Sequence, residues 1–236
     1  MILKETISRK FGFFLCAVIM FWLKTYAVYR TEFQLGLDNA LQHVLLFINP
    51  ISSTLFFLGI ALFFNGKLRL WLIVAIDFVL SLFLYANVCY YRFFNDFITL
   101  PVILHPNDAS ELSGSALSLM HGTDIFYFTD TFLLLTMVVF KAVRPGKKVS
   151  MREKVFVMAS ALMIFSINLV LAEADRPQLL TRAFDREYLV KYLGAYNYSI
   201  YDMVKTTRSS AQRAFADSSD LSGVRNFTKS KFTPPA

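Results

Sequence analysis

The sequence predicts an all-α membrane protein with five transmembrane helices, and three observations support this fold class. The 236 residues are 56% hydrophobic, 25 of them are phenylalanine, and the mean hydropathy is +0.48. Five apolar runs of about 18 to 25 residues match a hydrocarbon core of about 30 Å at a helical rise of about 1.5 Å per residue. Basic residues gather between alternate runs, as in the cytoplasmic loops of multi-pass proteins.

The first run covers about residues 11–29, follows three basic residues and ends in TYAVYR. A cleaved signal peptide has a shorter apolar region and a small-residue cleavage site behind it. We therefore expect an uncleaved signal-anchor helix.

The second run is interrupted. Residues 35–48 are apolar with four polar residues among them, and Pro50 separates them from the apolar residues 51–64. Proline removes a donor and disfavours helical geometry just before it. One interpretation is a long kinked helix. The other is a short outer interfacial helix that leads into a spanning helix, and the polar first half favours this second interpretation.

The other runs cover about residues 70–94, 123–140 and 155–172. A tight basic turn precedes the third run. The loop 95–122 is fairly apolar, so part of it is expected on the membrane surface, and the loop 141–154 is strongly basic.

The basic residues also predict the orientation of the chain. Three precede the first run, two lie in the turn before the third run and six lie in the loop 141–154, whereas the short outer segments carry only Arg30 and Arg92. The first group is therefore expected in the cytoplasm. Five spans then put the N-terminus inside and the C-terminus outside.

Three ionisable residues fall inside apolar runs, where such groups are costly. Lys24 is roughly 7 Å and Asp130 roughly 10 Å from the outer ends of their runs, so the two side chains can meet. Asp77 lies nearer the inner end and is expected to face another partner. Lys24 either snorkels to the outer headgroups or forms a polar pair with Asp130 that packs the bundle or lines a lipid-head cavity. Three such groups without a relay argue against an ion pathway.

Arginine and lysine side chains on the outer side are candidates for binding a lipid headgroup, because a guanidinium can hold two phosphate oxygens. The alternative is an ordinary charged rim held by salt bridges. The candidates are Arg92, Arg176, Arg182, Lys191 and Arg30.

The segment 176–205 is predicted to form an interfacial amphipathic linker helix after a membrane domain at residues 1–175. Leu180, Phe184, Tyr188 and Tyr192 recur every fourth residue, which suits the interface plane, although packing on protein alone explains the stripe equally well. Gly194 and Asn197 are expected to end this helix.

Residues 206–236 are small, polar and rich in basic groups, which indicates an extracellular linker. Ala214 and Ala216 form an A-x-A pattern of the kind that signal peptidase recognises, with cleavage expected between Ala216 and Asp217.

Several classes of function find no support in the sequence. It has no glycine-rich phosphate loop, no G-x-S-x-G elbow and no Cys/His metal spacing, so no catalytic or metal residue and no cofactor is expected in this chain. No base-reading module indicates a nucleic-acid partner. The two cysteines lie in apolar runs and are expected to be packing residues.

Four motifs resemble the lipoteichoic acid synthase family of Gram-positive bacteria, which includes polyglycerolphosphate synthases and primases. They are LKTYAVYR at 23–30, INP at 48–50, LYANVCYYRFFNDFIT at 84–99 and ADRPQLLTRAFDREYLVKYLGAYNYSIYDMVKT at 174–206. The resemblance implies a five-helix domain of the bacterial plasma membrane, linked to an extracellular catalytic domain. There, a threonine nucleophile and Mn²⁺ would transfer glycerol phosphate from phosphatidylglycerol to a growing polymer.

This chain stops at Ala236, before any such domain, so alone it is not expected to catalyse the transfer. Its expected role is to anchor and position the catalytic domain and to bind lipid substrate or product. Signal peptidase and cell-division or cell-wall proteins are further implied partners. The rival interpretation is a purely structural anchor or scaffold for cell-envelope proteins. A transporter would need a continuous polar path, which the sparse intramembrane charge disfavours.

Overall fold

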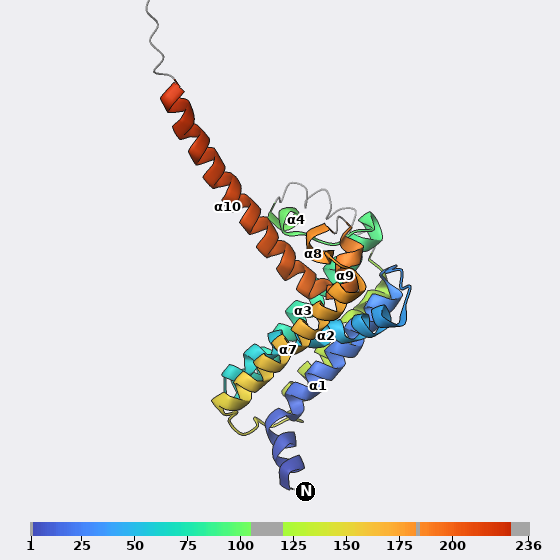
Figure 1. Ribbon diagram of the computed structural model, residues 1–236. Coiled ribbons are helices and arrows are strands. Elements are labelled where there is room, and N and C mark those ends of the chain that lie inside the picture. The colour runs from blue at the N-terminus through green and yellow to red at the C-terminus, as the bar shows by residue number, and fades with distance from the viewer. Residues whose placement is uncertain (1, 105–119, 183–184, 228–236) are drawn as a thin grey trace, which may run out of the picture.

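The computed structural model describes residues 2–104, 120–182 and 185–227, and every regular element in these ranges is helical. Figure 1 shows the long helices side by side as a bundle. The N-terminus and the loop between residues 139 and 151 lie at one end, and α4 (Leu100–Leu104), α8 (Leu179–Arg182) and α9 (Arg186–Leu193) lie at the other.

Within the described ranges, five helical segments are long and apolar enough to cross a membrane, which confirms the predicted number of candidate spans. They are Lys10–Thr31 in α1 (Ile2–Thr31), α2 (Ala40–Ile60) with η1 (Ala61–Phe63), α3 (Gly66–Phe94), η2 (Gly122–Phe128) with α6 (Thr129–Val139), and α7 (Met151–Asp175). Of the loop 95–122, residues 105–119 lie outside the described ranges, so its predicted surface position stays untested.

The second span is one helix that continues through Pro50, so the favoured interpretation of a separate interfacial helix was wrong. Asn39 caps its start by accepting a hydrogen bond from the Gln42 amide at 2.8 Å. Of the four polar residues at its start, Gln42 faces protein, whereas Asp38, Asn39 and His43 are exposed. Gln42 is 6% exposed and donates to Asp175 at 3.0 Å and to the Tyr192 hydroxyl at 3.0 Å.

The predicted single interfacial helix at 176–205 is also wrong, because this segment contains α8, α9 and the start of α10 (Ala195–Phe227). Residues 189–198 are buried, so α9 and the first turn of α10 form a hairpin inside the bundle. The Tyr196 hydroxyl donates to the Leu80 carbonyl, near the middle of α3, at 2.8 Å. The hairpin therefore enters the bundle to about half its depth.

Helix α10 continues to Phe227, well beyond the expected start of a linker at residue 206. Gly194 ends α9 as predicted, but Asn197 lies inside α10 and does not end a helix. In Figure 1, α10 leaves the bundle at an angle and extends away from it. Its first turns are held by protein contacts, including a hydrogen bond from the Leu100 amide to Asp202 at 2.7 Å.

Two buried clusters hold the bundle together. One surrounds Tyr29, Phe97 and Tyr192 toward the end that carries α9, and the other surrounds Phe14 and Leu62 toward the N-terminal end. Large apolar side chains on the outside of α7 are exposed instead. Phe156, Met163 and Val170 are 73%, 65% and 68% exposed, which is the pattern expected of a lipid-facing helix.

Candidate functional site

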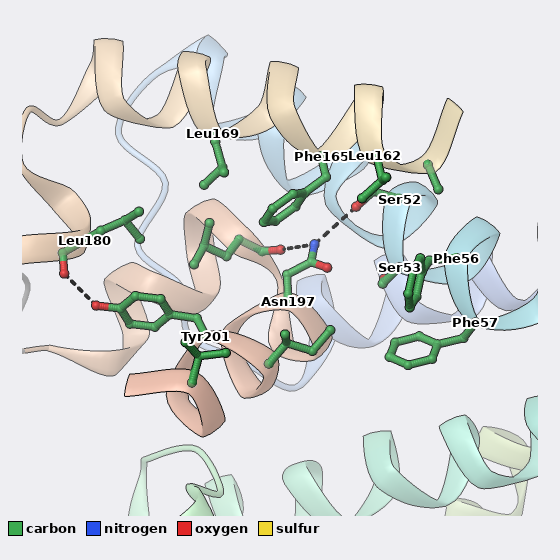
Figure 2. A pocket seen from close by; sticks show the side chains of 14 residues that line it. Ser52, Ser53, Phe56, Phe57, Leu162, Phe165, Leu169, Leu180, Asn197 and Tyr201 are labelled. Carbon is green, nitrogen blue, oxygen red and sulfur yellow. Dashed lines mark hydrogen bonds between the residues drawn. The ribbon is translucent and has the colours of Figure 1, made fainter. Parts of the chain in front are cut away.

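An apolar groove lies where the hairpin meets α2 and α7 (Figure 2). Its volume is about 380 Å³. The lining comes from both spans and from α8, α9 and α10. The lining residues are Ser52, Ser53, Phe56, Phe57, Ala161, Leu162, Phe165, Leu169, Leu180, Leu193, Asn197, Ile200, Tyr201 and Val204.

The polar groups in this lining bind one another or the backbone. Asn197 donates to the Leu193 carbonyl at 2.9 Å and to the Ser52 hydroxyl at 3.2 Å, and Figure 2 shows the contact with Ser52. The Tyr201 hydroxyl donates to the Leu180 carbonyl at 2.6 Å. Because these donors already have acceptors, the groove presents mainly hydrocarbon and suits an apolar guest.

The buried end of α9 is held by two asparagines from neighbouring spans. Asn49 on α2 donates to the Lys191 carbonyl at 3.0 Å, and Asn168 on α7 donates to the Tyr192 carbonyl at 2.8 Å. The last carbonyls of a helix have no partner within it, and inside a membrane they need protein donors. These amides therefore make it possible for a helix end to lie inside the bundle.

Gly194 makes the turn between the two arms of the hairpin. Its φ of 79° and ψ of 155° belong to a region that only glycine adopts readily. A Cβ at this position would lie 3.1 Å from the Asn49 Cβ and 3.3 Å from the Tyr29 hydroxyl. That hydroxyl accepts the Ala195 amide at 2.7 Å, so the backbone after the turn is also satisfied.

Lys191, predicted to bind a headgroup at the surface, is only 3% exposed. Its ammonium donates to the Gly36 carbonyl and to Gln42 at 3.3 Å, and it lies 3.7 Å from Asp38. The placement differs from the expected one because α9 is part of the bundle and does not lie on its surface.

Tyr192 beside this lysine donates to Asp175 at 2.5 Å. Burial and then this carboxylate raise the pKa of Tyr192 to about 12. The residue is therefore neutral and acts as a hydrogen-bond donor.

Arg92 forms part of a network of acidic and phenolic groups. Its guanidinium lies 3.1 Å from Glu32 and 3.0 Å from Asp124, and it donates to the Tyr127 hydroxyl at 3.2 Å. Burial opposes ionisation of Glu32, but hydrogen bonds from Arg92 and Tyr127 prevail and lower the pKa of Glu32. This geometry matches the alternative of a rim held by salt bridges.

The other headgroup candidates have separate surroundings. Arg176 is exposed and stacks on the Tyr188 ring at 3.8 Å, and Arg30 lies 3.2 Å from a His43 ring nitrogen. Arg182 lies in α8, and its side chain is outside the described part of the structure. A headgroup role for these residues stays a prediction.

The ionisable residues of the spans form one polar cluster. Lys24 lies 2.6 Å from Asp130 and donates to the Ser81 hydroxyl at 2.5 Å. The Ser81 hydroxyl lies 3.3 Å from that of Thr131, which donates to Asp77 at 2.6 Å. Asp77 does have another direct partner, Thr131, as expected, and through Thr131 and Ser81 it joins the cluster of Lys24 and Asp130. Because α3 begins at Gly66, four residues earlier than predicted, Asp77 lies about 17 Å along it and reaches the middle of the bundle.

Two further expectations concern metals and proteolysis. Among the described residues, no three histidine, cysteine, aspartate or glutamate side chains are grouped so that they could hold a metal ion. Ala214, Ala216 and Asp217 lie within α10, and cleavage between the last two stays a prediction.

The fold and the groove define the chain as a multi-pass, α-helical membrane domain with a surface open to apolar guests. Residues 1–215 match the family model described as the lipoteichoic acid synthase N-terminal domain. The chain therefore belongs to the lipoteichoic acid synthase family.

Three relatives show the extent of this similarity. The chain is 50% identical to lipoteichoic acid synthase 2 of Bacillus subtilis over 97% of its own length, and 46% identical to lipoteichoic acid synthase 1 of that organism over 99%. It is 41% identical to lipoteichoic acid synthase of Staphylococcus aureus strain USA300 over 98%. It spans 35% to 36% of the length of these relatives. No solved structure is significantly similar to the chain.

Proposed function

We propose that this domain anchors and positions the extracellular catalytic part of a glycerophosphotransferase that makes lipoteichoic acid from phosphatidylglycerol. The groove then holds an acyl chain of the lipid substrate or of the diacylglycerol product. The family membership supports the reaction class. The observation that supports the lipid role is the apolar groove. One of its walls is formed by α10, the helix that leads out of the bundle.

The depth of the groove favours an acyl chain over a headgroup. Its lining on α2 and α7 comes from residues near the middle of both spans, such as Phe56 and Phe165. Its polar atoms already have partners, so a phosphate there would lose its hydration without replacement. A hydrocarbon chain has no such cost and gains from burial.

The proposed orientation puts the exit of α10 on the outer face. Basic residues between the spans are concentrated near the N-terminus and in the loop between α6 and α7, which share one end of the bundle (Figure 1). Helices α8 and α9 lie at the other end. A catalytic domain that follows α10 would thus be held outside the cell, close to the outer leaflet.

Photo-crosslinking of lipids tests the groove. We expect phosphatidylglycerol with a diazirine on its acyl chain to label peptides of α7 and α10 in the membrane-embedded chain. Leu162→Trp and Val204→Trp fill the groove and should lower this labelling several-fold. Val170→Trp is the matched control, since Val170 is 68% exposed on α7 and does not line the groove.

The same variants in a full-length protein that carries this segment should slow polymer synthesis. Equal labelling of all four proteins would contradict the acyl-chain role. If labelling falls while polymer synthesis is unchanged, the domain is an anchor whose groove has no part in the reaction.

A further inference from the structure

A second pocket lies at the opposite end of the bundle from α9, and its lining is basic. Its volume is about 640 Å³. The start of α1, the first turns of α3 and the loop after α6 contribute to it. The lining residues are Lys10, Gly12, Phe13, Phe14, Arg69, Leu70, Ile73, Ala142, Val143, Arg144, Pro145, Gly146 and Lys147.

Arg69 is the central group of this pocket. The residue is 3% exposed, yet within the described part of the chain its guanidinium makes one hydrogen bond, to the Lys147 carbonyl at 3.3 Å. A guanidinium has five N–H donors, and a buried charge is costly unless an opposite charge accompanies it. No carboxylate lies among the lining residues.

The local helix does not explain this arginine. Arg69 lies in the first turn of α3, which contains no acidic residue and has no side-chain cap at Asn65. The helix dipole disfavours cations at an N-terminus, so the position opposes helix stability. An anion beside the guanidinium would offset both this repulsion and the cost of burial.

The other basic side chains of the pocket add to its positive potential. Arg144 and Lys147 come from the loop, and Lys10 comes from α1. Lys10 also binds Glu153 at 2.9 Å, which neutralises one of the four cations and leaves three. Phe14 and Ile73, 2% and 1% exposed, provide an apolar floor beneath these groups.

From this geometry we infer that the pocket binds a phosphate group, with the Arg69 guanidinium as its principal ligand. Two N–H donors of a guanidinium match two phosphate oxygens, and the loop cations surround the remaining charge. The apolar floor suits a phosphate that is attached to a lipid. The site lies at the end of the bundle away from the groove, so it goes beyond the proposed function and does not depend on it.

Thermal unfolding of the detergent-solubilised chain tests the site with two probes, phosphatidylglycerol added to dodecyl maltoside micelles and inorganic phosphate alone. We expect the unfolding midpoint to rise with phosphatidylglycerol. In Arg69→Gln and Arg144→Gln, the apparent affinity should fall about tenfold or more, as expected when a hydrogen bond to a charged group is lost. Lys148→Gln is the control, because this exposed lysine is adjacent to the pocket but does not line it.

The two probes separate the possible sources of the phosphate. Stabilisation by phosphatidylglycerol alone identifies a lipid headgroup, and stabilisation by inorganic phosphate as well identifies a site for phosphate in general. Equal midpoint shifts in the original chain, Arg69→Gln and Arg144→Gln overturn the inference, as does the absence of a shift with either probe. Native mass spectrometry of phosphatidylglycerol adducts provides a second readout if Arg69→Gln unfolds too readily for a melt.

Discussion

Gly194 is the residue with the strictest local requirement in the hairpin. Alanine there meets both an unfavourable φ of 79° and contacts of 3.1 and 3.3 Å with Asn49 and Tyr29. We expect Gly194→Ala to lower the free energy of unfolding by about 1–3 kcal/mol, the usual cost of such backbone strain. Denaturation in micelles measures this. Gly36→Ala is the control, because a Cβ there meets nothing within 4 Å.

Glu32 gives a predicted pH dependence. Its pKa is lowered in the folded protein, so its contribution to stability is fully present above its ordinary value of 4.5 and is lost as the pH falls through the lower folded value. We expect stability to decrease below pH 4.5, and Glu32→Gln to make this decrease smaller. Denaturant titrations at several pH values, followed by the fluorescence of Trp22 and Trp71, give the slope of stability against pH for the original chain and for Glu32→Gln. Identical slopes would contradict the prediction.

Individual polar residues in the spans were only partly predictable. Lys24 and Asp130 could be matched from their depth in two runs, and they lie 2.6 Å apart. The predicted depth of Asp77 was too small, because α3 begins four residues before the apolar run from which that depth was counted. Asn49 and Asn168 were not assigned roles, although an amide in an apolar run is itself a signal for a buried hydrogen bond. Their acceptors are carbonyls of α9, which could not be known before the hairpin was placed.

At the scale of elements, the capping of α9 by other helices leads to a prediction. Asn168→Ala leaves the Tyr192 carbonyl without its donor inside the bundle. We expect a loss of about 1–3 kcal/mol, the cost of an unsatisfied buried group. Faster hydrogen exchange of residues 189–198 should accompany this loss.

Ser166→Ala is the matched control for that variant. Ser166 is exposed on the same helix, and its hydroxyl donates to the Leu162 carbonyl within α7 at 2.9 Å. If both substitutions have the same effect, the capping role of Asn168 is wrong.

The apolar runs predicted the spanning helices because burial in lipid depends mainly on composition and length. The hairpin was not predictable in this way. The stripe through Tyr188 and Tyr192 indicates one apolar face but does not tell whether that face meets lipid or protein. Similarly, the polar face of α2 suggested headgroups, whereas Gln42 in fact binds Tyr192 and Asp175. In both cases the deciding contacts join residues far apart in the sequence.

At the scale of the whole molecule, the proposed orientation is testable by cysteine labelling in intact cells. After the natural Cys16 and Cys89 are replaced, we expect Met203→Cys on α10 to react with a membrane-impermeant maleimide. Lys148→Cys should react only after the cells are opened. Both native side chains are exposed, so access in the folded protein does not limit the reaction. Labelling of position 148 in intact cells would reverse the assigned topology.

The hairpin also constrains the order in which the protein can be assembled. Its partners Tyr29, Asn49, Leu80 and Asn168 belong to four different spans, and the last of these is α7, which directly precedes it in the chain. The site in the bundle that holds the hairpin is therefore complete only after α7 has been inserted. The start of α10 therefore reaches its final position only when the hairpin docks. Docking of the hairpin thus couples completion of this bundle to the placement of α10.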